Sequence, residues 1–179
     1  MIQGKRIYLR HLSEHDASKL FAYELTNRDF FMPTSFTRND NYYTLANIRK
    51  NIDNYKKEIT RKSGFRFGIF INSNHNLVGM IALNDILWSL KTSYVGYSLN
   101  QNHTNQGYMR EALNLLIKYS FEELKLHRLE AGVMPSNVSS WKVLEHCGFI
   151  REGLLRKNVH INGQWEDHYI YGCLNENEN

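Results

Sequence analysis

Proline and cysteine are scarce in this chain, and both shortages restrict what the protein can be. Only two of the 179 residues are proline and two are cysteine. No proline-, glycine- or serine-rich linker interrupts the sequence, which predicts a single domain over residues 1–179. Two cysteines cannot build a disulfide framework, and the apolar surroundings of Cys147 and Cys173 favour reduced thiols in the core.

Long hydrophobic runs are also missing. No stretch has the length of a membrane span, and the N-terminus "MIQGKRIYLRHL" lacks the apolar core of a signal peptide. We therefore expect a cytoplasmic protein with no membrane partner. The net charge is +4 and the pI is near 9.0, but the Lys and Arg residues are scattered and no DNA- or RNA-binding motif occurs. We expect no DNA partner, and an RNA-binding function would rest on mild basicity alone.

Hydrophobic periodicity predicts an α/β (α+β) fold, a mixed central sheet of about seven strands flanked by about four helices. Strands are predicted at 5–12, 65–72, 77–86, 92–99 and 127–134, and as a hairpin within 150–174. Helices are predicted at 13–27, 41–62, 107–124 and 137–149. The hairpin should turn at Asn162-Gly163, because this dipeptide is the strongest short-range hairpin signal.

One glycine marks the joint between a polar loop and a long helix, in "NQNHTNQGYMREAL". A helix N-terminus offers free backbone N–H groups and the positive end of the helix dipole, which together suit a phosphate group. Gly107 would let a pyrophosphate approach the backbone closely. The alternative is that Gly107 serves only as a tight-turn residue before the helix.

A second candidate segment is "PSNVSSW". Asn137 is a good N-cap for the helix that follows, and Ser140 lies one turn into that helix. Helix capping alone would explain Asn137.

These segments, in this order, carry a resemblance to a known family. "YVGYSL", "GYMREAL", "HRLEAGVMPSNVSSWKVLEHCGFIREG" and "INGQWEDH" resemble the GNAT acetyltransferase superfamily, and "LRHLSEHDASKL" is the best match in the first half. Within that superfamily, the chain is most similar to the ribosomal-protein-alanine N-acetyltransferases. The resemblance implies acetyl-CoA as co-substrate and a primary amine as acceptor, with the α-amine of a (ribosomal) protein favoured. It leaves a homodimer open.

The resemblance also implies which residues contact acetyl-CoA. They are Tyr97, Ser98, Leu99, Thr104, Asn105, Gln106, Gly107, Tyr108, Met109, Arg110, Asn137 and Ser140. In the phosphate loop, the Arg or Gln that is common in the family is Thr104 here, the second glycine is Asn105 and the final Gly or Ala is Met109. Backbone donors do not depend on side chains, and Asn tolerates the left-handed conformation, so we expect the loop to keep its shape.

Fewer residues are candidates for a catalytic role than for contact with acetyl-CoA. In the family, the serine matching Ser140 has been assigned as the group that protonates the departing CoA thiolate. Many members place a Glu on the strand before the phosphate loop, where this chain has Tyr94. Asp85 is the nearest acidic candidate for a general base, although a strand-end residue can also cap a turn. Glu111 suits the helix dipole better than proton removal, and bulk water could serve as base.

Two other segments have open interpretations. Phe30 and Phe31 could wall the acceptor site or belong to the core. Asp167 and His168 are adjacent in a predicted strand and point to opposite faces, so they cannot hold one ion together, and we expect no metal site.

The sequence leaves two other functions open. One is acetylation of a small-molecule amine, such as a polyamine or an antibiotic. The other is a non-catalytic acyl-CoA-binding module, because the phosphate loop is altered and the strand Glu is missing. Release of CoA in the presence of an amine separates an enzyme from a binding module.

Overall fold

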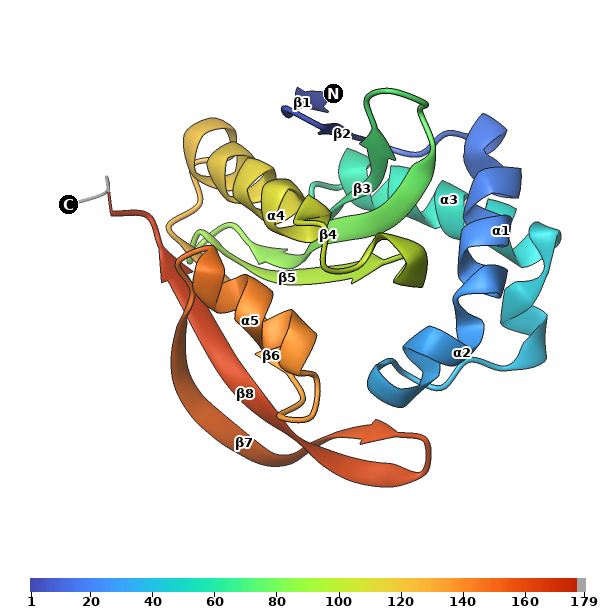
Figure 1. The fold of residues 1–179 in the computed structure, drawn as a ribbon. Coiled ribbons are helices and arrows are strands. Elements are labelled where there is room, and N and C mark those ends of the chain that lie inside the picture. The colour runs from blue at the N-terminus through green and yellow to red at the C-terminus, as the bar shows by residue number, and fades with distance from the viewer. Residues whose placement is uncertain (177–179) are drawn as a thin grey trace.

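A computed structural model describes residues 1–176 (Figure 1). One sheet of eight strands runs through the molecule in the order β1-β2-β3-β4-β5-β6-β8-β7. The strands are β1 (Ile2–Gln3), β2 (Ile7–Arg10), β3 (Phe65–Ile71), β4 (Leu77–Leu87), β5 (Thr92–Leu99), β6 (Arg128–Val133), β7 (Ile150–Ile161) and β8 (Gln164–Leu174). Neighbouring strands are antiparallel except β5 and β6, which are parallel.

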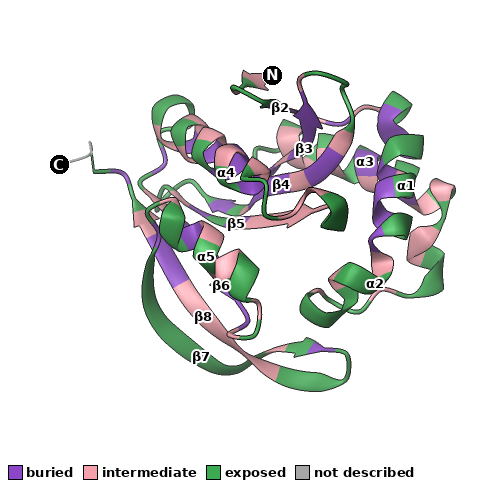
Figure 2. Ribbon diagram, viewed as in Figure 1, coloured by how far each residue is buried: buried purple, intermediate pink, exposed green. Residues whose placement is uncertain are grey.

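Helices cover both faces of this sheet. They are α1 (Ala17–Thr26), α2 (Arg28–Phe31), α3 (Leu45–Thr60), α4 (Tyr108–Lys118) and α5 (Val138–His146). Successive strand residues point to opposite faces of the sheet and so belong to two hydrophobic cores. Ile7 and Leu9 pack with residues of α4 and α5, whereas Tyr8 packs with residues of α1 and α3. Figure 2 shows the buried residues concentrated on the central strands and on the helix faces turned toward them.

The predicted α/β architecture is confirmed, with one more strand and one more helix than expected. The additions are β1 and α2, which span two and four residues and are too short for hydrophobic periodicity to reveal. The predicted hairpin turn is also confirmed, since Asn162 and Gly163 have φ angles of 49° and 79°.

The sheet splits between its two parallel strands. β5 pairs with β6 only from Thr92 to Tyr94, and the last pair is Tyr94 with Glu130. Beyond that pair, β5 continues to Leu99 and β6 to Val133 without bonding to each other. Backbone groups of β5 that face the gap are thereby left available, and this fork is the central feature of the candidate site.

The two cysteines are unpaired and half-buried, as the sequence predicted. Burial raises the pKa of Cys147 to about 11, so it stays a neutral thiol near neutral pH. Within the described part of the chain, no helix is long and apolar enough to cross a bilayer.

Candidate active site

The loop before α4 adopts the conformation that the sequence predicted. Gly107 is the N-cap of α4 with φ 79°, and Asn105 also lies in the left-handed region with φ 58°. The Glu111 N–H donates to the Gly107 carbonyl at 3.1 Å, so the N–H groups of Tyr108, Met109 and Arg110 precede the helical ladder. Together with the helix dipole, these donors make a site for an anion.

Arg6, which follows β1, braces this loop from the side. Its side chain donates from Nη1 to the Gln106 carbonyl at 2.8 Å and from Nε to Glu111 Oε2 at 2.9 Å. Its backbone N–H donates to Glu111 Oε1 at 2.8 Å. Burial of Glu111 opposes ionisation, but the hydrogen bonds from Arg6 prevail and lower the pKa of Glu111. Glu111 is therefore an anionic anchor for Arg6, in the first turn of α4.

A buried amide holds the other end of the loop. Asn27 is fully buried at the end of α1, and its Oδ1 accepts from the Gln101 N–H at 2.9 Å. Its Nδ2 donates to the Tyr23 carbonyl at 2.8 Å. The loop between β5 and α4 is thus fixed to α1 as well as to the N-terminal segment.

On the α5 side of the fork, two hydroxyl groups meet. Ser140 Oγ donates to the Tyr97 hydroxyl at 3.1 Å, and that hydroxyl donates to the Ser140 carbonyl at 2.9 Å. Burial raises the pKa of Tyr97, so the phenol stays protonated. Asn137 caps α5, with its side chain accepting from the Ser140 N–H at 3.3 Å. The capping interpretation of Asn137 is confirmed, and Ser140 is brought to β5.

The opposite, α1 side of the fork is also polar. The Tyr23 hydroxyl donates to Ser98 Oγ at 2.8 Å. A hydrogen bond with Glu130 raises the pKa of Tyr94, so this residue cannot replace a carboxylate base near neutral pH. Asp85 is exposed in the irregular segment where β4 pairs with the start of β5, at the end of β5 remote from the α4 loop. The structure does not bring Asp85 together with Ser140.

An apolar rim lies beside this face. It consists of Phe30, Met32 and Phe36, which are exposed in the chain segment that connects α1 to α3. Phe31, in the same segment, packs into the core against Tyr23. The core interpretation is therefore confirmed for Phe31, whereas a place in the wall of the acceptor site stays a prediction for Phe30.

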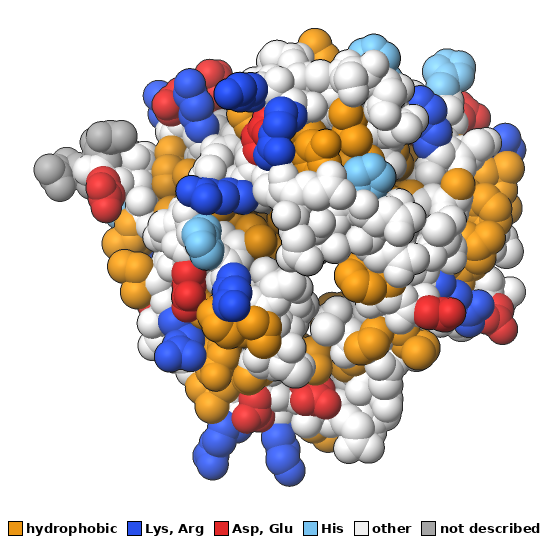
Figure 3. All heavy atoms as spheres, in the orientation of Figure 1, with side chains coloured by type: hydrophobic (Ala, Val, Ile, Leu, Met, Phe, Trp, Pro, Cys, Tyr) orange, Lys and Arg blue, Asp and Glu red, His pale blue; other side chains and the backbone are white. Residues whose placement is uncertain are grey.

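The tip of the β7–β8 hairpin reaches across to this rim. Asn162 Nδ2 donates to the Met32 carbonyl at 2.7 Å, and the Asn162 N–H donates to Thr37 Oγ1 at 3.2 Å. The hairpin and the segment after α1 thereby enclose the fork from one side, where Figure 3 shows a hollow in the surface.

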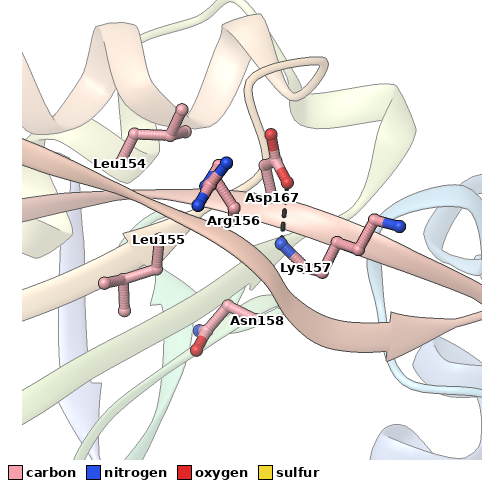
Figure 4. A pocket seen from close by; sticks show the side chains of 6 residues that line it. All are labelled: Leu154, Leu155, Arg156, Lys157, Asn158 and Asp167. Carbon is pink, nitrogen blue, oxygen red and sulfur yellow. Dashed lines mark hydrogen bonds between the residues drawn. The ribbon is translucent and has the colours of Figure 1, made fainter.

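Asp167 has a structural contact of its own. It lines a shallow hollow on the irregular part of β7, and its carboxylate accepts from the Lys157 N–H at 2.7 Å (Figure 4). Lys157 has a φ of 48°, so Asp167 holds a left-handed residue in the strand irregularity. Within residues 1–176, no group of three or more His, Cys, Asp or Glu side chains could hold a metal ion.

The sequence pointed to both ends of the site and missed the residues that brace it. The predicted contact residues 97–99, 104–110, 137 and 140 lie along β5, the loop before α4 and the start of α5. Arg6 and Asn27 were missed, because each acts on a loop about 75 to 100 residues away in sequence. No local pattern marks such contacts.

Comparison with known proteins agrees with this geometry. A family model described as Acetyltransferase (GNAT) domain matches residues 6–150. The probable N-acetyltransferase YjcK of Bacillus subtilis (strain 168) is 45% identical over 179 residues, covering 99% of each chain. The [Ribosomal protein uS5]-alanine N-acetyltransferase of Escherichia coli (strain K12) is 29% identical over 166 residues, covering 92% of this chain and 86% of that protein.

A solved structure of an acetyltransferase has a similar fold. The ribosomal-protein-S5-alanine acetyltransferase of Vibrio fischeri superimposes with a TM-score of 0.92 at 28% identity, covering 98% of this chain and 96% of that one. The similarity thus extends over the whole fold, including both sides of the fork.

Proposed function

The chain belongs to the GNAT acetyltransferase family, and we propose that it acetylates the α-amine at the N-terminus of a protein, a ribosomal protein being the favoured class. As a GNAT N-acetyltransferase it takes the acetyl group from acetyl-CoA. The class of acceptor is inferred from the side chains on the surface around the fork.

The donor set of the loop fits the pyrophosphate of acetyl-CoA. Gly107 and Asn105 supply the left-handed conformations, and the backbone N–H groups at the start of α4 supply the donors. The pantetheine arm would follow the free edge of β5 into the fork, as an added strand follows a sheet edge. Its thiol end would then lie near Tyr97 and Ser140, which meet at that edge.

The residues present can perform direct transfer. The acceptor nitrogen forms a bond to the acetyl carbon, the carbon–sulfur bond breaks, and the sulfur keeps the electron pair. Backbone N–H groups of β5 in the fork can stabilise the developing oxyanion. Ser140 Oγ, which is hydrogen-bonded to Tyr97, can give a proton to the departing sulfur and recover one from solvent. Holding both substrates in one site supplies much of the remaining rate acceleration.

The rim of the site favours a peptide over a polycation. Glu24 is buried and paired with Arg38, while Glu130 accepts from Arg128 at 2.7 Å. These carboxylates are already neutralised, so they do not form the acidic pocket that a polyamine would need. The exposed apolar side chains of Phe30, Met32 and Phe36 would instead contact the first side chains of a peptide. This apolar rim is the observation that carries the acceptor assignment.

An acceptor panel tests the proposal. Purified protein and acetyl-CoA would be incubated with a peptide that begins with a free alanine, with the same peptide carrying a blocked N-terminus and an internal lysine, and with spermidine. We expect acetylation of the free alanine peptide, located by mass spectrometry, and little of the other two. Faster acetylation of spermidine would replace the peptide by a small-molecule amine. A homodimer, which the resemblance leaves open, would be tested separately by sedimentation.

A further inference from the structure

Two glycines face each other across the fork, each two residues beyond the last paired residues of β5 and β6. A Cβ atom on Gly96 would lie 3.2 Å from Nδ2 of Asn84. A Cβ atom on Gly132 would lie 2.9 Å from Nδ1 and 3.6 Å from Cε1 of His168. Each glycine therefore makes room for a polar side chain from the next strand outward, and the imidazole lies directly over β6.

The register fixes which face of the sheet these groups occupy. Gly132 pairs with Ile170, so His168, two residues earlier in β8, is its diagonal neighbour on the same face. The pairing of Tyr94 with Glu130 continues that face onto β5, where Ser98 meets Tyr23 of α1. His168 thus lies on the α1 side of the fork, opposite to Ser140 and beside the apolar rim.

The chemical state of His168 suits proton acceptance. The side chain is half-buried, and burial lowers its pKa below the ordinary value, so the ring is neutral near neutral pH. Within residues 1–176, neither ring nitrogen has a protein hydrogen-bond partner. The titratable or charged side chains on or beside this face include those of Tyr23, Asp85, Tyr94, Arg128, Glu130, Glu152, Arg156, Lys157 and Glu166.

We propose that His168 is the general base that accepts the proton of the attacking amine. As the nitrogen bonds to the acetyl carbon, it becomes positively charged, and its proton passes to a ring nitrogen of His168. The carbon–sulfur bond then breaks, the sulfur keeps the electron pair, and it takes a proton on the Ser140 side. Gly132 is exposed, so water can carry the proton from His168 to solvent. The inference applies to any amine acceptor and does not depend on which one is natural.

Replacement of the imidazole tests the assignment. His168→Gln should lower kcat by about 10²- to 10⁴-fold, the usual range for a lost general base, while the Kd for acetyl-CoA stays within about twofold. The wild-type kcat should fall in acid, with a midpoint below about 6.5, and His168→Gln should lack this limb. His15→Gln is the matched control, because His15 is exposed in the short 3-10 turn that precedes α1. It should keep wild-type kcat.

A second variant keeps the imidazole and moves it. Gly132→Ala places a Cβ 2.9 Å from Nδ1, too close for the ring to stay where it is, so kcat should fall at least about tenfold. Gly153→Ala is its control, because open space surrounds that position on β7. These two substitutions keep the test decisive if His168→Gln fails to fold.

A measurement without turnover completes the test. The imidazole signals of His168 in the NMR spectrum, assigned by their loss in His168→Gln, should shift when the best acceptor of the panel is added in the absence of acetyl-CoA. The signals of His15 should not shift. If folded His168→Gln and Gly132→Ala retain kcat within about threefold and the acid limb, His168 only packs on Gly132 and the proposal is wrong.

Discussion

Replacement of Arg6 is the sharpest test of how the phosphate loop is held. The peptide between Gln106 and Gly107 is planar, so its carbonyl and its N–H point in opposite directions. Because Arg6 Nη1 holds the Gln106 carbonyl at 2.8 Å, it also directs the Gly107 N–H to the other side of the loop. Arg6→Ala should release this peptide and lose one aligned donor to the phosphate.

The expected magnitude follows from the contacts. A hydrogen bond to a charged group contributes about 1.5–3 kcal/mol, so the Kd for acetyl-CoA should rise about 10- to 100-fold. The loss of stability should be only about 1 kcal/mol, because the Arg6 side chain is 46% exposed and exposed ion pairs contribute little. Glu111 also keeps its backbone donors, the N–H groups of Arg6 and Ile7.

Calorimetric titration with acetyl-CoA, combined with urea unfolding, separates these two effects. Arg66→Ala is the matched control, since Arg66 forms a partly exposed ion pair with Glu58 at 3.0 Å, away from the loop. It should lose similar stability and keep the wild-type Kd. Arg6→Lys should recover little, because an ammonium group cannot reproduce the planar fork of a guanidinium. An unchanged Kd in folded Arg6→Ala would refute the reasoning.

Three further predictions concern single residues. Gly107→Ala puts a Cβ 3.1 Å from Arg6 Nη2 at a φ of 79°, so this variant should bind acetyl-CoA more weakly in calorimetry. Gly148 is also left-handed but has open space around it, so Gly148→Ala should only lower the stability, by about 1–2 kcal/mol in urea unfolding. Ser140→Ala should lower kcat more than it raises KM for acetyl-CoA, and unaltered steady-state kinetics would leave Ser140 as a helix residue only. Burial of Asp16 disfavours its ionised form, but the hydrogen bonds from Arg10 prevail and lower the pKa of Asp16 from 3.8 to about 2. The Arg10–Asp16 pair therefore stabilises the fold above about pH 4, and this contribution is lost as the pH falls toward 2. Asp16→Asn should therefore be less stable than wild type near neutral pH, with a difference that narrows across that window in urea unfolding series.

The sequence carried the parts of this fold that local chemistry determines. Gly107 and Asn105 were expected to hold the loop because few residues tolerate left-handed angles, and both have them. Asn137 was identified as a cap from residue type and position, and it accepts from the Ser140 N–H. Such features depend on residues a few positions apart, so they can be deduced from the order of letters.

The remainder depends on register between strands that are distant in sequence. Arg6 reaches Gln106 only because β2 lies beside the start of α4, and His168 lies over Gly132 only through the pairing of β6 with β8. A glycine inside the strand "RLEAGV" was the available signal for a close approach, but it did not reveal which side chain approaches. Asp85 was chosen by proximity in sequence, and the strand register places it at the far end of β5.

The most direct test of acetyl-CoA binding at the α4 loop is a calorimetric comparison of two acetyl donors. Acetyl-CoA carries the pyrophosphate, whereas acetyl-pantetheine has the same thioester without it. We predict saturable binding of acetyl-CoA that is weakened at least about tenfold by Gly107→Ala, and acetyl-pantetheine binding too weak to saturate. Equal affinity for the two compounds, or no binding of acetyl-CoA at millimolar concentration, would contradict a phosphate site at Gly107.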